Sequence, residues 1–123
     1  MTCQELITAS TENIPLKIVV FNNGNHGMVR QWQKIFYDHR FSASELTHHT
    51  PDYVALAEAI GAVGLRMVEK SDVNRVFEEM FKVNDRPVLV DCVVDPDDMV
   101  FPMVPAGGSN DVVLLNEDDL KKI

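Results

Sequence analysis

The feature that most constrains the fold is an apolar run at residues 16–21, which ends at Asn22 and Asn23. Only Lys17 interrupts the run, and such continuity predicts a strand that is covered on both faces, as in a parallel sheet. In an open α/β sheet, ligands bind in the crevice at the carboxyl ends of the strands. Two amides at this position therefore predict a metal-binding or phosphate-binding site at residues 22–25.

The asparagine pair also has a purely structural interpretation, because Asn tolerates left-handed backbone and is common in turns. In the functional interpretation, a side-chain oxygen and a nearby backbone carbonyl belong to the oxygen shell of Mg²⁺, which a carboxylate and substrate phosphates would complete. Residues 24–27 (Gly-Asn-His-Gly) would then bring the backbone close to a phosphate at the N-terminus of the next helix. The residue types alone leave both interpretations open.

Helical and extended patterns alternate along the chain. Thr2 and Glu5 have the spacing of a capping box, which predicts a short helix over residues 3–12. A chain that begins directly on a helix cap is expected to be a piece of something larger. After Gly27 the apolar residues follow a helical period, and residues 40–50 form an irregular, polar surface loop.

The second half of the chain continues this alternation. Pro51 and Asp52 predict the start of another helix, with Pro51 at its first position and Asp52 in its first turn. Ser71 is expected to cap a third long helix, and Asn84 to end it in a left-handed conformation. The expected strands are residues 65–68 and 87–94. This order predicts an α/β fold, a partial doubly wound parallel sheet with flanking helices and right-handed crossovers.

The composition excludes several classes of protein. With 123 residues the chain forms one domain at most, and its net charge of −8 argues against a nucleic-acid partner. No apolar run reaches the roughly 18–20 residues of a membrane span. Cys3 and Cys92 are isolated in the sequence, which favours two reduced thiols over a disulfide and therefore a cytoplasmic protein.

Several motifs together resemble the large catalytic subunits of acetolactate synthase (acetohydroxyacid synthase), which are thiamine-diphosphate enzymes. Thiamine-diphosphate enzymes carry a signature that begins with Gly-Asp-Gly and ends in Asn-Asn, and residues 22–23 match its end. Residues 27–33 (Gly-Met-Val-Arg-Gln-Trp-Gln) and 102–107 (Pro-Met-Val-Pro-Ala-Gly) are the most specific matches. The other matching segments are residues 36–37, 40–42, 51–53, 56–59 and 86–91. The resemblance covers nearly the whole chain in order.

The resemblance implies roles for particular residues. Asn23 corresponds to the side-chain ligand of Mg²⁺ and Asn25 to the residue that offers a backbone carbonyl, whereas Asn22 is the weaker candidate ligand. Met28 matches a methionine that packs against the thiamine cofactor, and Trp32 matches a tryptophan that shapes the 2-keto acid pocket. The cofactor-binding segment consists of Asn23, Gly24, Asn25, His26, Gly27 and Met28, and no residue in it, His26 included, is assigned a catalytic role.

Other interpretations of these and neighbouring residues stay open. Met28 and Trp32, together with Ile35 and Phe36, would also make an ordinary buried helix face. Arg30 and Arg40 could bind a substrate carboxylate, although surface salt bridges are the simpler expectation. The adjacent residues His48 and His49 lack a third ligand at a suitable spacing, so we interpret them as loop residues and not as a zinc site.

By this resemblance, residues 1–95 are the C-terminal portion of a thiamine-diphosphate-binding domain, and residues 96–123 are a tail. The Gly-Asp-Gly half of the signature, with its Mg²⁺-binding aspartate, is not in the chain. The pyrimidine-binding domain and the FAD-binding domain of the family are not in it either. The chain alone is therefore expected to be inactive, and FAD is implied only for a full-length parent.

The parent would be a transferase of branched-chain amino-acid biosynthesis. It would decarboxylate pyruvate on thiamine diphosphate and condense the two-carbon unit with a second 2-keto acid. Its partners would be the rest of the catalytic subunit and a second subunit in a homo-oligomer. The alternatives are another thiamine-diphosphate-dependent decarboxylase or carboligase, and a non-catalytic interaction domain.

Overall fold

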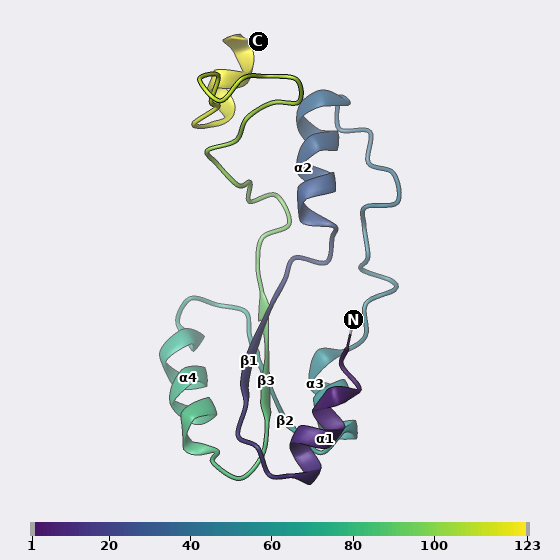
Figure 1. The fold of residues 1–123 in the computed structure, drawn as a ribbon, viewed down its shortest axis with the longest axis vertical. Coiled ribbons are helices and arrows are strands. Elements are labelled where there is room, and N and C mark those ends of the chain that lie inside the picture. The colour runs from purple at the N-terminus through teal and green to yellow at the C-terminus, as the bar shows by residue number, and fades with distance from the viewer. Residues whose placement is uncertain (1, 123) are drawn as a thin grey trace. The chain divides into compact units, whose positions relative to one another are not determined.

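The computed structural model describes residues 2–122, with side chains through Asp119. Its elements follow the order α1 (Glu5–Thr11), β1 (Lys17–Asn22), α2 (Gly27–Phe36), α3 (Tyr53–Ala59), β2 (Val63–Met67), α4 (Asp72–Lys82), β3 (Val88–Val93) and a 3₁₀ helix, η1 (Glu117–Lys122). This is the predicted alternation of helices and strands (Figure 1). The chain divides into two compact units. One comprises the segment that ends at Asn23 together with His49–Asp95, and the other comprises Gly24–His48 together with the segment that starts at Pro96.

The first unit is built on a three-stranded parallel sheet in the order β1-β3-β2. In the register, Lys17 pairs with Val88 and Asn22 with Val93, so β1 and β3 run side by side over their full lengths. The predicted α/β fold with a parallel sheet and flanking helices is therefore confirmed.

Two apolar clusters hold this sheet between its helices. On one face, α4 packs on the strands through Val76 and Met80, against the buried residues Val88, Val90 and Cys92 of β3. On the other face, Leu89 packs with Ala57 of α3 and Leu6 of α1. Figure 1 shows α4 on one side of the sheet, with α1 and α3 on the other. The alternation along β3 decides which of its side chains meets which helix.

The helix ends differ in detail from the sequence prediction. Gln4 is the N-cap residue of α1 and makes no side-chain cap hydrogen bond, so the predicted Thr2–Glu5 capping box is wrong. The Glu5 N–H instead donates to the Thr2 carbonyl at 3.1 Å, which makes a backbone turn. A backbone partner removes the need for the Thr2 side chain to accept that hydrogen bond.

Helices α3 and α4 also begin differently. Asp52 is the N-cap residue of α3, so Pro51 lies outside the helix and not at its first position. Ser71 makes no cap hydrogen bond with α4; the Asp72 carboxylate instead accepts hydrogen bonds from the N–H groups of Val68 and Glu69. A carboxylate one residue farther along therefore replaces the predicted serine cap.

The C-terminus of α4 is also different from the expectation. Val83 is its C-cap residue and has extended backbone, with φ −81° and ψ 115°. Among the non-glycine residues with positive φ in the part of the chain that the structure describes, Asn84 does not appear, so the predicted left-handed cap is wrong. The chain leaves α4 directly in an extended conformation that leads into β3.

Candidate functional site

The first unit contributes the asparagine pair, which lies where the sequence predicted it, at the carboxyl end of β1. Asn22 is the last residue of the strand, and Asn23 follows it. The Asn22 carbonyl accepts a hydrogen bond from the Val94 N–H at 3.0 Å, so β1 and β3 stay paired up to their ends. Both asparagine side chains are half-buried.

The side chain of Asn22 is held by a carboxylate on the central strand, β3. Its Nδ2 donates to Oδ1 of Asp91 at 3.0 Å, and Asp91 is only 2% exposed. The Nε of Arg66, on β2, donates to Oδ2 of the same carboxylate at 3.1 Å. Side chains from all three strands therefore meet at Asp91, on the face of the sheet that α3 covers.

The network continues from Arg66 to the start of α3. An Nη2–H of Arg66 donates to Oδ1 of Asp52 at 2.7 Å, and that oxygen also accepts from the N–H groups of Val54 and Ala55. The hydrogen bond to Asp91 is the main cause that raises the pKa of Arg66 above its ordinary value. The hydrogen bond from the Ala55 N–H is the main cause that lowers the pKa of Asp52, with help from Val54 and Arg66.

The lowered pKa of Asp52 predicts a pH dependence of stability. Because the folded-state pKa lies below the unfolded value, the ionised carboxylate stabilises the fold above the unfolded pKa of about 3.9, and this contribution is lost as the pH falls through the folded pKa. We compare the free energy of unfolding of the unsubstituted chain with that of Asp52→Asn. The two values should differ most above about pH 5 and converge in acid. Urea unfolding between about pH 3 and 7 measures this, and parallel pH profiles would contradict it.

The second unit contains the rest of the predicted cofactor-binding segment, Gly24 to Met28. Gly24 has a φ of +64°, a conformation that favours glycine. Its carbonyl accepts from the Leu46 N–H at 2.8 Å, and the His26 N–H donates to the Ser44 carbonyl at 2.8 Å. The turn is thus held by backbone hydrogen bonds to residues 44–46.

Residues 40–50 contain no helix or regular strand, as predicted, but one of their side chains is completely buried. Ser44 is 0% exposed, and its hydroxyl donates to Oε1 of Gln33 at 2.6 Å. The amide of Gln33 also donates to the Ser42 carbonyl at 2.9 Å. This part of the loop is therefore fastened to α2 as well as to the turn that precedes α2.

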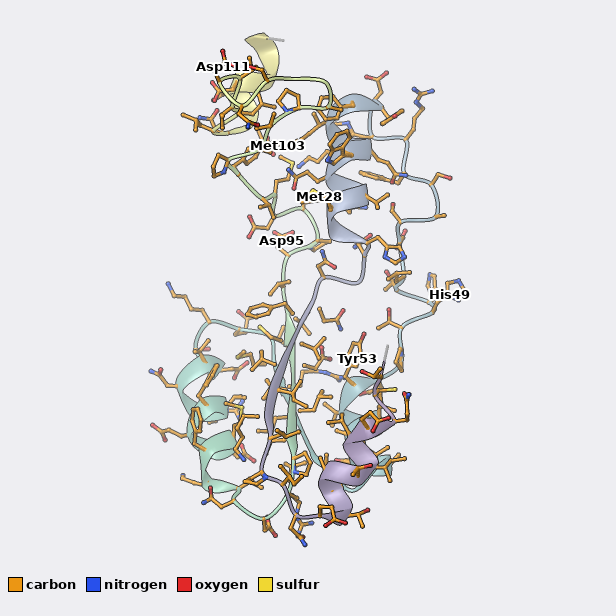
Figure 2. The ribbon with its side chains drawn as sticks, viewed as in Figure 1. Met28, His49, Tyr53, Asp95, Met103 and Asp111 are labelled. Atoms are coloured by element: carbon orange, nitrogen blue, oxygen red, sulfur yellow. The ribbon has the colours of Figure 1, made fainter. Side chains whose placement is uncertain are left out.

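Helix α2 begins at Gly27, directly after the turn. The N-cap residue His26 is exposed, and its side chain makes no cap hydrogen bond with the helix. One side of α2 lines a cavity of about 780 Å³. Met28 and Trp32 lie in its wall with Val29, Gln33, Tyr37, Arg40 and Ser42. Figure 2 labels Met28 on α2. Met28 is 54% exposed, which agrees better with a cavity wall than with a closed core for the Met28 and Trp32 face.

The two arginines that were considered as carboxylate-binding groups have protein partners. Arg30 donates to Oδ1 of Asp97 through both Nε and Nη2, at 3.2 and 2.9 Å, and its guanidinium lies 4.0 Å from the ring centre of Phe41. These hydrogen bonds lower the pKa of Asp97. Arg40 donates from Nε to the Tyr37 carbonyl at 3.0 Å. The expected surface salt bridge is confirmed for Arg30.

Gln31 joins α2 to the segment around Val100, which belongs to the same unit as α2. It is 5% exposed, and its side chain both accepts from the Val100 N–H at 2.9 Å and donates to the Val100 carbonyl at 3.1 Å. The same amide nitrogen lies 3.2 Å from the sulfur of Met103. A single side chain therefore pairs both backbone groups of one residue in that segment.

We expect Gln31→Leu to loosen residues 98–104 without unfolding α2. Each of the two hydrogen bonds contributes about 1 kcal/mol, so the Val100 amide should exchange with solvent at least about tenfold faster. Hydrogen exchange followed by NMR measures this rate, with Gln4→Leu at an exposed position as the control. An unchanged exchange rate at Val100 would show that Gln31 does not hold the segment.

The sequence located the asparagine pair, the glycine turn and the helix that carries Met28 and Trp32, but it did not identify Asp91 or Gln31 as important. The available signal for Asp91 was a single acid in an otherwise apolar strand. His48 and His49 are both exposed loop residues. Among the residues that the structure describes, no group of three His, Cys, Asp or Glu side chains could hold a metal ion. In the same residues, no helix is long and apolar enough to cross a membrane.

Comparison with known proteins gives consistent matches. The chain is 50% identical over 116 residues to the acetolactate synthase of Mycobacterium bovis, which covers 92% of this chain and 19% of that protein. It is 46% identical over 113 residues to the acetolactate synthase large subunit of Corynebacterium glutamicum, covering 89% of this chain and 18% of that protein. It is 40% identical over 114 residues to the acetolactate synthase isozyme 2 large subunit of Escherichia coli K12, covering 93% of this chain and 20% of that protein.

These relatives confirm the resemblance to acetolactate synthase large subunits, and the chain spans about a fifth of their length. Residues 1–92 match the family model described as "Thiamine pyrophosphate enzyme, C-terminal TPP binding domain". That match includes the asparagine pair, the glycine turn and all of the sheet except Val93. Because the match covers well over half of its residues, the chain belongs to the thiamine pyrophosphate enzyme family, as a C-terminal TPP binding domain.

Proposed function

We propose that the chain supplies the thiamine-diphosphate-binding part of an acetolactate synthase. The whole enzyme would decarboxylate pyruvate and condense the two-carbon unit with a second 2-keto acid, as a transferase of branched-chain amino-acid biosynthesis. When bound, thiamine diphosphate supplies the carbon nucleophile and the electron sink for this chemistry. The chain's own residues would bind the diphosphate end, hold the metal and form part of the substrate pocket.

The metal would be Mg²⁺, with Asn23 giving its side-chain oxygen and Asn25 its backbone carbonyl. These donors are neutral oxygens, the type of ligand that this hard cation takes. None of residues 22–28 has a carboxylate, so the negative charge at the site would come from the diphosphate and from other parts of the catalytic subunit. The donor set therefore fits a metal that is shared between protein and cofactor.

The N-terminus of α2 would face the diphosphate. Its first residue is Gly27, and the side chain of its N-cap residue His26 makes no cap hydrogen bond with the helix. The backbone N–H groups at the N-terminus of a helix, together with the helix dipole, favour the binding of an anion. Gly24 and Gly27 would thus bind the cofactor through their backbone, and His26, whose own N–H donates to the Ser44 carbonyl, would lie beside it.

Met28 and Trp32 would meet the organic part of the ligands. Both lie in the wall of the 780 Å³ cavity beside α2, which is a suitable size for a small molecule. We assign Met28 to the thiamine rings and Trp32 to the 2-keto acid. An indole ring gives a large apolar surface that can select substrates by shape.

The single observation that carries this proposal is the asparagine pair at the carboxyl end of β1, in a chain that belongs to the thiamine pyrophosphate enzymes. The resemblance to acetolactate synthase large subunits supports the rest of the proposed assembly. The partners would be the rest of the catalytic subunit and a second subunit in a cytoplasmic homo-oligomer. FAD would bind outside residues 1–123. Within these residues, 1–95 would act as the binding domain and 96–123 as its tail.

A chimera tests the proposed function. Residues 1–123 would replace the matching segment of the acetolactate synthase large subunit of Corynebacterium glutamicum. We expect the purified chimera to form acetolactate from pyruvate, with activity that requires both thiamine diphosphate and Mg²⁺. A chimera that folds and assembles but forms no acetolactate would contradict the proposal, and formation of another product would support a different thiamine-dependent reaction.

A further inference from the structure

The buried carboxylate of Asp91 is costly for the fold and has no role in the proposed cofactor contacts. Asp91 is the only charged residue of β3, whose other residues are apolar, and it is 2% exposed. A charge in the interior is tolerated only when it is paired and hydrogen-bonded. Its partners are therefore informative about why the strand contains it.

The strand register places Asp91 on the strand next to the asparagine pair and on the same face of the sheet as Asn22. Asp91 pairs with Val20 in the sheet, and Asn22 is two residues farther along β1. Because side chains alternate between the faces of a sheet, Val20 and Asn22 share one face. The 3.0 Å hydrogen bond from Asn22 to Asp91 is thus a diagonal contact between neighbouring strands.

The chemistry of the two groups fixes how the Asn22 amide is turned. A carboxylate only accepts hydrogen bonds, so it selects the Nδ2 end of the amide and not the oxygen. Arg66 holds the other carboxylate oxygen at 3.1 Å, and Asp52 holds Arg66 in turn at 2.7 Å. Asp91 is therefore held from the opposite side, which limits the movement available to the Asn22 side chain.

We infer that Asp91 is a positioning residue that fixes Asn22, and through it the Asn22–Asn23 turn, so that Asn23 is pre-oriented for the metal. This inference rests on the proposed function, in which Asn23 is the side-chain ligand. A series of hydrogen bonds runs from α3 through β2 and β3 to the end of β1, and the inference assigns this series a role in metal binding. Partners behind the first ligands commonly tune metal sites in this way.

The first test uses the complete 123-residue chain without metal. In NMR spectra, Asp91→Leu should shift the side-chain NH₂ signals of Asn22 and the backbone amide signal of Asn23. Asp91→Asn keeps one acceptor oxygen and should shift them less. Cys92→Ala, at the next residue of the same strand, should leave them in place. Unshifted Asn22 signals in Asp91→Leu would overturn the inference.

The second test uses the chimera and separates metal affinity from turnover. Asp91→Leu should raise the half-saturating Mg²⁺ concentration about tenfold, while kcat at saturating Mg²⁺ stays within about twofold. Asp91→Asn should recover part of the lost affinity, and Cys92→Ala should match the parent chimera. A fall in kcat with an unchanged Mg²⁺ requirement would mean a merely structural role and would overturn the inference.

A double substitution guards against a general effect on folding. If Asp91 acts through Asn22, then Asn22→Ala should raise the Mg²⁺ requirement by a similar factor, and Asp91→Leu should add little in that background. If the two substitutions each raise the Mg²⁺ requirement and their factors multiply in the double variant, the inference is overturned and the proposed function is left intact. A parent chimera without Mg²⁺-dependent activity would instead overturn the proposed function, and the inference with it.

Discussion

Asn23→Ala should abolish most of the Mg²⁺-dependent acetolactate formation of the chimera. A partner behind the metal ligands typically changes metal affinity by a factor of 10–100, so we expect removal of a direct side-chain ligand to lower kcat/KM by more than about 100-fold. Steady-state kinetics over a range of Mg²⁺ concentrations measures the loss. Saturating Mg²⁺ should restore only part of the rate, because the substitution leaves one coordination position without a protein ligand.

The matched control for this prediction is Asn74→Ala. Asn74 is exposed on α4, so the same chemical change occurs far along the chain from the asparagine pair. This variant should have the kinetics of the parent chimera. Equal losses in Asn23→Ala and Asn74→Ala, or an Asn23→Ala chimera with the parent Mg²⁺ requirement, would contradict the assignment of Asn23.

Gly64→Ala should have the largest effect on the stability of the chain. A Cβ atom at Gly64, in β2, would lie 2.6 Å from the carbonyl oxygen and 2.8 Å from the Cα of Val54, in α3. Both atoms belong to the backbone, so α3 must move away from the sheet. We expect the free energy of unfolding to fall by about 3 kcal/mol, which is a large part of the 5–15 kcal/mol typical of a domain. Urea unfolding measures it.

Gly107→Ala separates crowding from the loss of backbone freedom. Gly107 has a φ of +77°, and a Cβ there would meet no atom within 4 Å. The only cost is the left-handed conformation, about 1–2 kcal/mol. If Gly64→Ala were no more destabilising than Gly107→Ala, the close approach of α3 to β2 would not be a constraint on the fold.

The sequence predicted the fold well where a long periodic signal was present. The apolar run that became β1, and the order of helices and strands, follow from patterns that extend over many residues. The predictions of the helix caps were wrong because each cap depends on one side chain and on local backbone geometry. Asp72, and not Ser71, meets the N–H groups that precede α4, and the letters of the sequence do not distinguish these two choices.

The candidate site was predictable only in part, for a related physical reason. Asn22 and Asn23 are adjacent in the sequence, and a strand pattern precedes them. Asp91 lies 69 residues from Asn22, and its contact with that amide exists only because β1 and β3 pair in one particular register. Gln31 similarly pairs with Val100 at the same sequence separation. Polar contacts over such distances are set by tertiary structure and leave little trace in local composition.

In the proposed site, Asn23 gives an oxygen ligand to a metal that also binds the cofactor diphosphate. A crystal structure of the chimera with thiamine diphosphate and Mg²⁺, and a second one with Mn²⁺ for its anomalous signal, tests this most directly. We predict a metal ion with the Oδ1 atom of Asn23 at about 2.1 Å and the diphosphate oxygens among its other ligands. A metal–diphosphate complex that is bound in the chimera without any contact to Asn23 would contradict its assignment as a metal ligand.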